Sequence, residues 1–326
     1  MHWKEKIYKS AYTVAESFKD DPRVLGIAIG GSVAKNVVWK HSDLELGIVV
    51  DERIKEYEYF NFIEGLGVEI IQIKKSDIID FTDNFTQPDE KLLKFPIQIY
   101  KCRIIYDPQN IIKPFKEIYD NSLFHTNIAS IKESESLGHA DGRYEQAKSL
   151  FEKGNFNTAL SHLRIAINAL LLAYYWHYSI LPRSQNRTVY FLKKNSAKIG
   201  HDVLYNAFVD IFCLNKTLGE MQNALASAKP EIFSVSKAWG ESAPDFLEKA
   251  VDINLEWGYP KSITYVYKWC MHILQCSDLC TEDYCDTTEY KNKYPNLYEF
   301  LDFSTINMSD LEKMLAQYQD ARKMLQ

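Results

Sequence analysis

Residues 30–50 read GGSVAKNVVWKHSDLELGIVV, and this stretch indicates both a fold and a chemistry. It follows an apolar run at residues 24–29 and opens on a Gly-Gly-Ser turn. Eleven residues after Ser32 come Asp43 and Glu45, at the start of a second apolar run. Side chains two positions apart on a strand point to the same face of the sheet. The two carboxylates are therefore expected to lie side by side.

Two neighbouring carboxylates repel each other unless a cation lies between them, and Mg²⁺ favours one or two carboxylates together with substrate phosphates. A turn of small residues that opens a helix separately offers backbone N–H groups to a phosphate. Each feature also has an ordinary interpretation, the turn as a plain loop and Asp-x-Glu as the solvated face of a strand. The fixed order of strand, Gly-Gly-Ser turn, helix and strand favours a metal-dependent nucleotide site.

The chain as a whole has the composition of a globular protein. Its 326 residues are 46% hydrophobic and 25% charged, which allows two domains that each bury a core. The longest apolar stretch, residues 166–176, is too short to span a membrane. The first residues lack an apolar signal core, so we expect a cytoplasmic protein without a membrane partner. The net charge of −6 argues against a nucleic-acid partner bound through its phosphates.

The first half of the chain alternates between helical and extended patterns, and the second half is helical, so we expect an α+β protein. Strands are expected at residues 24–29, 44–50, 68–73 and 97–105. Helices are expected at residues 7–18, 32–38, 76–81 with Ser76 as N-cap, and 111–119. After about residue 121 only helices are expected: one ending at Gly154, one capped by Asn157, and others at 201–214, 242–257, 261–275 and 309–325, the last with a capping box from Ser309. The boundary falls at residues 120–127.

The Gly-Ser turn followed by an acidic pair on the next strand resembles the signature of the nucleotidyltransferase superfamily, the polymerase-beta-like group. Ser42, Asp43 and Glu45 fill the Ser-Asp-x-Glu pattern of the kanamycin, or aminoglycoside, nucleotidyltransferases, with Glu in place of the commoner second Asp. The resemblance covers residues 20–180. It implies a catalytic domain at residues 1–122, with a small mixed β-sheet flanked by helices. An all-α helical-bundle domain that binds the substrate would follow at residues 123–326.

The resemblance implies an enzyme that transfers AMP from ATP, or from another nucleoside triphosphate, to a hydroxyl of a small acceptor and releases pyrophosphate. Mg²⁺ would be the cofactor, held by Asp43 and Glu45. Glu69 is the candidate for a third carboxylate, because a charge in its apolar strand is costly unless it is paired or bound to metal. The alternative is that Glu69 lies on the exposed face of an edge strand.

The resemblance also implies which residues contact the nucleotide and the acceptor. Its phosphate-binding residues correspond to Gly30, Gly31, Ser32, Lys35 and Ser42, although Lys35 is nearly as compatible with a solvated lysine. A glutamate of the helical domain would take the proton from the acceptor hydroxyl. Among the candidates Glu133, Glu135 and Glu145, we favour Glu145, while a solvated helix face is the alternative for each of them.

Three readings of function stay open. The first is modification of a small molecule, for which an aminoglycoside-like antibiotic is one candidate. The second is modification of a protein or a tRNA, as in toxin–antitoxin or stress systems. The third is an inactive nucleotide-binding relative, because Val37-Val38-Trp39 replaces the polar, Gly-rich loop of many active relatives. A homodimer is compatible with the resemblance.

The cysteines at 270, 276, 280 and 285 match no common zinc spacing, which favours reduced thiols.

Overall fold

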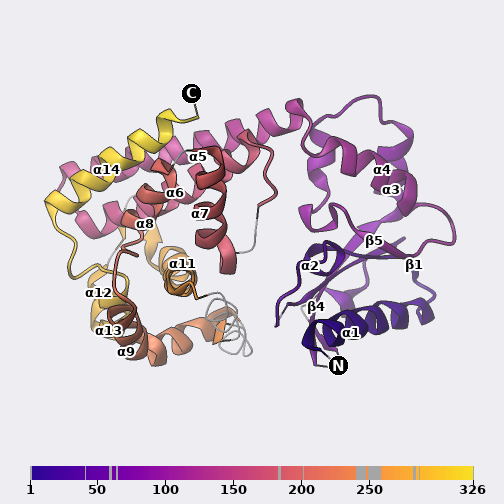
Figure 1. The fold of residues 1–326 in the computed structure, drawn as a ribbon, viewed down its shortest axis with the longest axis horizontal. Coiled ribbons are helices and arrows are strands. Elements are labelled where there is room, and N and C mark those ends of the chain that lie inside the picture. The colour runs from indigo at the N-terminus through magenta and orange to yellow at the C-terminus, as the bar shows by residue number, and fades with distance from the viewer. Residues whose placement is uncertain are drawn as a thin grey trace. The chain divides into compact units, whose positions relative to one another are not determined.

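The structure, a computed structural model, divides the chain into two compact units, Met1–Ile131 and Lys132–Gln326 (Figure 1). We call them the N-terminal unit and the helical unit. The residues that the structure describes are 2–40, 42–58, 61–63, 65–182, 185–200, 202–239, 247–248, 258–281, 284–285 and 287–325. The boundary expected after residue 122 falls at the end of helix α4 (Ile112–Ser122), whereas the units divide in the second turn of α5 (Thr126–Glu152).

The N-terminal unit is built on one mixed sheet. Its strands are β1 (Val24–Ile29), β2 (Leu44–Val50), β3 (Asn61–Ile63), β4 (Leu66–Lys74) and β5 (Arg103–Tyr106). They lie in the order β3-β4-β2-β1-β5. Strands β2 and β4 are parallel, and the other neighbouring pairs are antiparallel. The predicted strands at residues 24–29 and 44–50 are confirmed to the residue.

Helices cover the two faces of this sheet (Figure 1). Helix α1 (Trp3–Ser17) begins with a capping box made by His2 and Glu5. Its buried residues join a core with alternate residues of β1 and β2, such as Ile27 and Leu46. Helices α3 (Lys75–Asp83) and α4 pack against each other on the other side, through a ring cluster of Phe81, Phe95, Phe115 and Tyr119. The sheet is therefore buried on both faces over its central strands.

Three local predictions in this unit are wrong. The helix expected at residues 32–38 is the single turn α2 (Gly31–Ala34). Residues 97–105 are not one strand, because Ile97–Ile99 form a 3₁₀ turn and Lys101 has a φ of 56° before β5 begins. Helix α3 begins one residue early, with Lys74 at the N-cap position and no side-chain cap, so Ser76 is inside the helix.

The described part of the helical unit contains α5 from Lys132 onward, α6 (Phe156–His177), α7 (Thr188–Ile199), α8 (Val203–Ile211), α9 (Leu218–Ser236), α11 (Pro260–Leu279), α12 (Thr287–Lys293), α13 (Pro295–Phe300) and α14 (Met308–Lys323). A two-stranded ladder, β6 (Cys280–Thr281) with β7 (Tyr284–Cys285), interrupts the helices. The expectation of an all-α second half is therefore wrong at this ladder. The coarser prediction, an α+β protein with a mixed sheet followed by helices, is confirmed.

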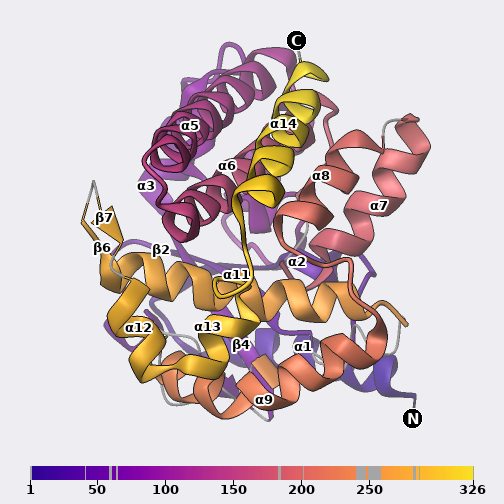
Figure 2. The same ribbon diagram turned by 90° about the vertical axis from the view of Figure 1, so that its left-hand side faces the viewer.

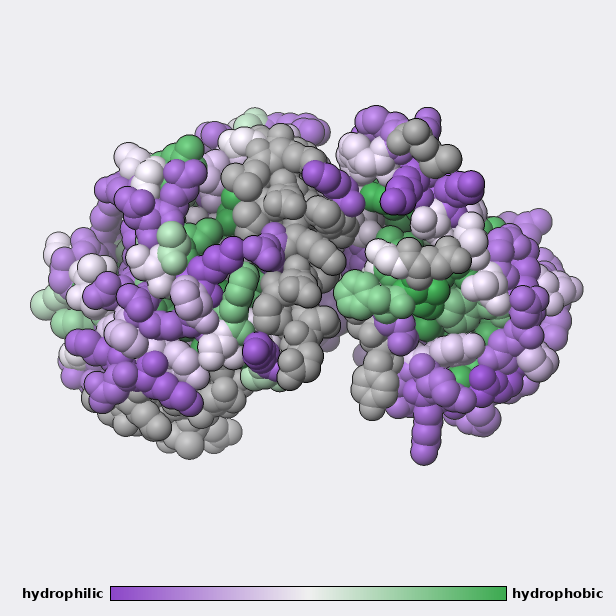
Figure 3. Space-filling model, turned by 90° about the horizontal axis from the view of Figure 1, so that it is seen from below, coloured by the Kyte–Doolittle hydropathy of each residue, from purple (hydrophilic) through white to green (hydrophobic). Residues whose placement is uncertain are grey.

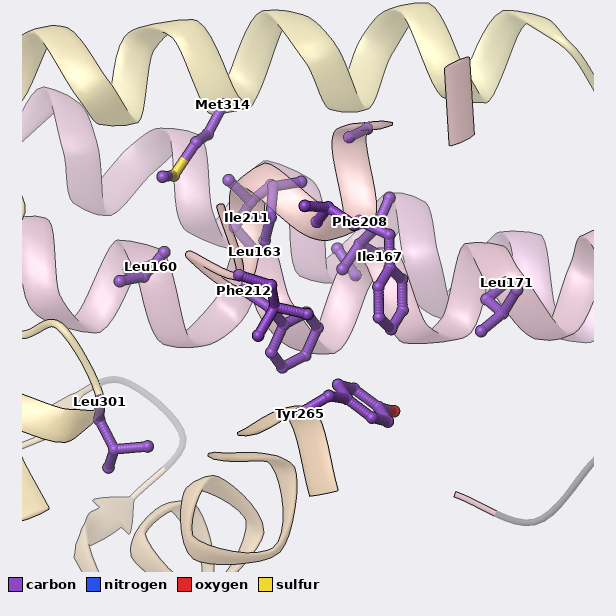
Figure 4. Packing of buried hydrophobic residues seen from close by; sticks show 14 of the residues in the cluster. Leu160, Leu163, Ile167, Leu171, Phe208, Ile211, Phe212, Tyr265, Leu301 and Met314 are labelled. Atoms are coloured by element: carbon purple, nitrogen blue, oxygen red, sulfur yellow. The ribbon is translucent and has the colours of Figure 1, made fainter. Parts of the chain in front are cut away.

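Helix α6 is at the centre of the core of this unit. Leu160, Leu163 and Ile167 of α6 face Phe208 and Phe212 at the end of α8, with Tyr265 of α11 beyond them (Figure 4). Figure 2 shows α14 lying across α6 and α8, and α9 alongside α11 and α13. The apolar spacing along residues 160–171 therefore reflects burial among several helices.

Two buried cations join the ends of α8 and α13. Arg164 donates from Nε to the carbonyl oxygen of Ile211 at 3.2 Å and from Nη1 to that of Leu301 at 2.9 Å. Lys268 donates from Nζ to the carbonyl oxygen of Phe212 at 3.1 Å, and both cations contact the Asp302 carboxylate. The last carbonyls of a helix lack partners within the helix. The two side chains supply those partners and bury their charges on the negative ends of the helix dipoles.

Helix α6 is the one helix in the described part of the chain that is long and apolar enough to cross a membrane. Of its apolar window, 67% is buried inside the structure, as is typical of a core helix. Figure 3 shows one face of the molecule, where hydrophilic side chains cover most of the coloured surface and apolar areas are smaller.

Several boundaries in the helical unit differ from expectation. Helix α6 begins after Asn155 rather than at an Asn157 cap, and α14 is capped by Asn307, whose side chain accepts from the Asp310 N–H, rather than by Ser309. Helices α7 and α9 were not expected. The helix expected at 242–257 falls outside the described residues except at 247–248. Of the four clustered cysteines, Cys270 has a described side chain, which is buried.

Candidate active site

Three acidic residues lie close together near the beginnings of β2 and β4 in the N-terminal unit. Glu45 on β2 is the register partner of Glu69 on β4. Directly paired residues in a sheet have their side chains on the same face. Asp43 precedes Glu45 by two residues and is half-buried immediately before β2. The structure therefore brings together the three carboxylates that the sequence singled out.

The Gly-Gly-Ser turn lies against the same end of β2. Gly30 is the N-cap of α2 and donates its N–H to the carbonyl oxygen of Glu45 at 2.7 Å. A Cβ atom on Gly30 would lie 2.7 Å from the carbonyl oxygen of Gln98, which leaves no room for a side chain. Gly31 has a φ of 53°, a conformation that favours glycine. Both glycines are therefore required by the local geometry.

Glu45 touches the turn with its side chain as well as its backbone. The Ser32 N–H donates to Oε2 of Glu45 at 3.1 Å. A Cβ atom on Gly31 would lie 1.3 Å from the same oxygen, so the carboxylate fills the space that a side chain at position 31 would need. The hydroxyl of Ser32 is buried and, within the described part of the chain, has no hydrogen-bond partner. It is available to a ligand placed at the turn.

Burial and neighbouring negative charge raise the pKa of two of these carboxylates, Glu45 and Glu69. Burial, and then the charge of Asp43, raises the pKa of Glu45 to about 7, with a further contribution from Glu69. The Ser32 N–H and Lys35 act in the opposite direction. Burial and the charge of Asp43 also raise the pKa of Glu69. These shifts mean that the anionic form of the cluster is costly, so a bound cation would stabilise it.

The donor set suits a hard cation, because all its donors are carboxylate oxygens. Among the residues that the structure describes, however, no group of three or more His, Cys, Asp or Glu side chains is placed to hold a metal ion. The acidic residues lie close together without forming a completed coordination shell, since the side chain of Glu45 is hydrogen-bonded to Ser32. Binding of a metal by all three would require Glu45 to change its contact.

Lys35 and Ser42 lie on the segment between the turn and the acidic pair. Lys35 is the C-cap of α2, is half-buried, and acts electrostatically on Glu45. Ser42 is buried, and its Oγ accepts the Trp39 N–H at 2.7 Å while its own N–H donates to the Trp39 carbonyl at 3.0 Å. Lys35 is therefore placed near the carboxylates, whereas the contacts of Ser42 close the loop before Asp43.

Arg103, which the sequence analysis did not single out, holds the far end of the turn. Its Nε donates to the carbonyl oxygen of Ala34 at 2.8 Å, Nη2 to Oδ1 of Asn36 at 2.7 Å, and Nη1 to the hydroxyl of Tyr12 at 3.0 Å. One guanidinium thus links β5, α1 and the C-terminal end of α2. An arginine in an otherwise apolar strand was the available signal, because such a charge must find partners.

The three glutamates proposed as general base all lie on α5. Glu133 contacts Nδ1 of His177 at 2.8 Å, and Glu135 contacts Nζ of Lys132 at 2.7 Å. Glu145 is exposed. Arg143, on the same helix, contacts Gln146 and His162. Two of the three glutamates are thus paired with cationic or ionisable side chains.

No protein-family model matches the chain, and no curated protein matches it. Among solved structures it is similar to a nucleotidyltransferase-like protein from Exiguobacterium sibiricum 255-15, at 14% sequence identity and a TM-score of 0.38. The match covers 77% of this chain and 92% of the other. A likeness at that level adds nothing to the case for the site, which depends on the residues described above.

Proposed function

We propose that the chain is a Mg²⁺-dependent nucleotidyltransferase that transfers AMP from ATP, or another nucleoside monophosphate from its triphosphate, to a hydroxyl of a small acceptor. The observation that carries the proposal is the proximity of Asp43, Glu45 and Glu69 to one another beside the Gly30–Ser32 turn. Carboxylates for a hard cation next to N–H donors for phosphate are what phosphoryl chemistry needs, since its barrier is mostly positioning and charge.

We assign a separate role in phosphate or metal binding to each residue of the site. The turn of Gly30, Gly31 and Ser32 would hold phosphate oxygens through N–H groups and the Ser32 hydroxyl. Lys35 would add positive charge beside them. Asp43 and Glu45 would hold Mg²⁺, with Glu69 as the third ligand; the bound metal neutralises charge on the phosphates. The role of Ser42 would be to fix the loop that carries Asp43.

The acceptor hydroxyl must also lose a proton, and we keep Glu145 as the proposed base. Its carboxylate is exposed, whereas Glu133 and Glu135 are paired with His177 and Lys132. A small cationic acceptor, such as an aminoglycoside-like antibiotic, suits a chain with a net charge of −6. A cytoplasmic location and a homodimer remain predictions.

The test incubates purified protein with Mg²⁺, labelled ATP and a panel of hydroxylated acceptors, and measures pyrophosphate. Release is expected in the wild type and should fall at least about a hundredfold in Asp43→Asn, while the circular dichroism spectrum is unchanged. The matched control is Asp51→Asn, an exposed acid immediately after the other end of β2. Equal release from Asp43→Asn and the wild type would contradict the proposal.

Two other results would favour a different function over modification of a small acceptor. An AMP adduct on a co-purified protein, detected by mass spectrometry, would assign a macromolecular acceptor. Metal-dependent ATP binding without pyrophosphate from any acceptor would assign an inactive relative.

A further inference from the structure

We infer that the side chain of Glu45 occupies the phosphate-binding turn of its own chain, and that it must leave the turn before a triphosphate can bind there. Binding of the metal and of the nucleotide are thereby coupled through one carboxylate. The inference rests on the proposed function and assigns a regulation to the same site.

The geometry shows why the occupancy is exclusive. The Ser32 N–H has one hydrogen to donate, and it donates to Oε2 of Glu45 at 3.1 Å. The same oxygen lies within 1.3 Å of the position that a Cβ on Gly31 would take, so it is in direct contact with the turn. A phosphate oxygen bound to Ser32 would need this hydrogen and this space. Two anions cannot share them.

Glu45 makes two contacts to the turn, one through its backbone and one through its side chain, and only the side-chain contact can be released easily. Its carbonyl oxygen accepts the Gly30 N–H at 2.7 Å, a contact that is fixed because Glu45 belongs to β2. Its carboxylate contact can be released by side-chain rotation without disturbing the strand. The turn would therefore stay attached to β2 while its Ser32 N–H becomes free.

A bound cation would favour release of the Glu45 carboxylate from the turn. Glu69 is the register partner of Glu45, and the charge of Asp43 acts on both of them, so a cation held by Asp43 and Glu69 would attract the Glu45 carboxylate away from Ser32. A ligand that favours one of two states shifts the equilibrium only by its differential affinity, and the coupling is reciprocal. Mg²⁺ should therefore free the turn for the triphosphate, and the triphosphate should strengthen binding of Mg²⁺.

The first experiment separates loss of the contact from loss of the charge. Glu45→Gln removes the charge and keeps an oxygen that can accept the Ser32 N–H, Glu45→Ala removes both, and Asp43→Asn removes a neighbouring charge alone. Affinity for a non-hydrolysable ATP analogue is measured by calorimetry in EDTA. Glu45→Ala should bind about tenfold tighter than Glu45→Gln, and Asp43→Asn should resemble Glu45→Gln. Equal affinities for the two Glu45 variants would overturn the inference.

The second experiment follows the Ser32 amide itself by NMR hydrogen exchange. In the wild type in EDTA the amide should be protected, and protection should fall in Glu45→Ala and, in the wild type, on addition of Mg²⁺ alone. Unchanged protection in either case would overturn the inference. Thermal unfolding of each variant verifies that it is folded, with Glu45→Gln as the conservative substitution.

The outcomes also distinguish this inference from the proposed function. Failure of every protein to bind the analogue, with or without Mg²⁺, would overturn both. Binding by the wild type with Mg²⁺, together with indistinguishable Glu45→Ala and Glu45→Gln affinities in EDTA, would overturn the coupling and leave the proposed function standing.

Discussion

Glu45 and Glu69 are direct partners in the parallel ladder between β2 and β4, so two acidic side chains face the same side at the same level of the sheet. Such like-charged pairs are destabilising in the absence of a counter-charge. A protein that keeps the pair beside Asp43 carries a local energetic cost that a bound cation would remove. The first prediction follows from that cost.

Glu69→Gln should have opposite effects in EDTA and in Mg²⁺. In EDTA, removal of one charge should raise the free energy of unfolding by about 0.5 kcal/mol, because the side chain is only half-buried and solvent screens the repulsion. In millimolar Mg²⁺, the gain in melting temperature seen for the wild type should be smaller for the variant. Glu58→Gln, at an exposed acid, is the control. Equal gains in Mg²⁺ for the wild type and Glu69→Gln would exclude Glu69 as a ligand.

Gly31→Ala should destabilise the N-terminal unit through two separable effects. Its φ of 53° costs about 1–2 kcal/mol for alanine, and the new Cβ would overlap Oε2 of Glu45 at 1.3 Å. In the Glu45→Ala background only the backbone cost remains. Urea unfolding of the four proteins of this double-mutant cycle should therefore give a coupling energy of about 1 kcal/mol or more.

The matched control for this cycle is Gly65→Ala. Gly65 has a φ of 75°, and a Cβ there would meet no atom within 4 Å. It should show the backbone cost without coupling to Glu45→Ala. Additive losses for Gly31→Ala and Glu45→Ala would show that the carboxylate can move off the turn at no cost.

Arg103→Ala should destabilise the N-terminal unit by about 2–3 kcal/mol, since it leaves the acceptors on Ala34, Asn36 and Tyr12 without their charged donor. Arg103→Lys should recover part of this loss, because an ammonium cannot reach all three acceptors. Lys94→Ala, at an exposed lysine, should change stability by less than about 0.5 kcal/mol. Urea unfolding measures all three, and a loss for Arg103→Ala no larger than the control would show that the contacts are not maintained.

The helical unit should lose stability in mild acid. Burial, and then the charge of Arg143, lowers the pKa of His162 from 6.5 to about 4, and burial lowers that of His272 to about 3. Between pH 6.5 and 4 the unfolded chain therefore binds protons that the folded chain does not, so the free energy of unfolding falls as the pH falls. For His162, which is partly exposed, the loss at pH 4 should be about 2 kcal/mol.

His162→Gln should remove that part of the acid sensitivity, measured as the change in unfolding free energy between pH 7 and pH 4. His139→Gln is the control, because His139 lies on α5 and is exposed. Identical pH profiles for the wild type and His162→Gln would show that His162 is protonated in the folded protein.

The central strands were predictable because β1 and β2 are short and mostly buried, so each is an apolar run with turn residues or charges at its ends, broken in β2 by Glu45. The prediction of one strand at residues 97–105 was wrong for a physical reason. Ile99 and Cys102 are buried, but Ile99 lies in a 3₁₀ turn and Cys102 follows Lys101, whose φ is positive. The alternation of apolar residues cannot distinguish this arrangement from a strand. Helix α9 was missed because Pro230 lies inside it and its buried residues include Ala228 and Ser236, which contribute little to an apolar pattern.

The acidic pair and the turn were visible in the sequence because both are local patterns. Their contact was not, because the Glu45–Ser32 hydrogen bond joins residues thirteen positions apart and depends on how the turn packs against β2. The register that places Glu69 opposite Glu45, and the three contacts of Arg103, likewise arise from the assembled sheet. Sequence patterns thus singled out the residues proposed for the chemistry, but not the interactions among them.

The buried contacts of Arg164, Lys268 and Asp302 bear on the order in which the protein can form during synthesis. Arg164 emerges from the ribosome long before the Leu301 carbonyl and Asp302 that complete its shell, so the core of the helical unit stays unfinished until that late stretch is made. The N-terminal unit needs only its first 131 residues for its own contacts. It can therefore fold first, as N-terminal domains generally do. The half-made helical unit would meanwhile expose apolar helices, so we expect it to be the part of the nascent chain most prone to aggregation.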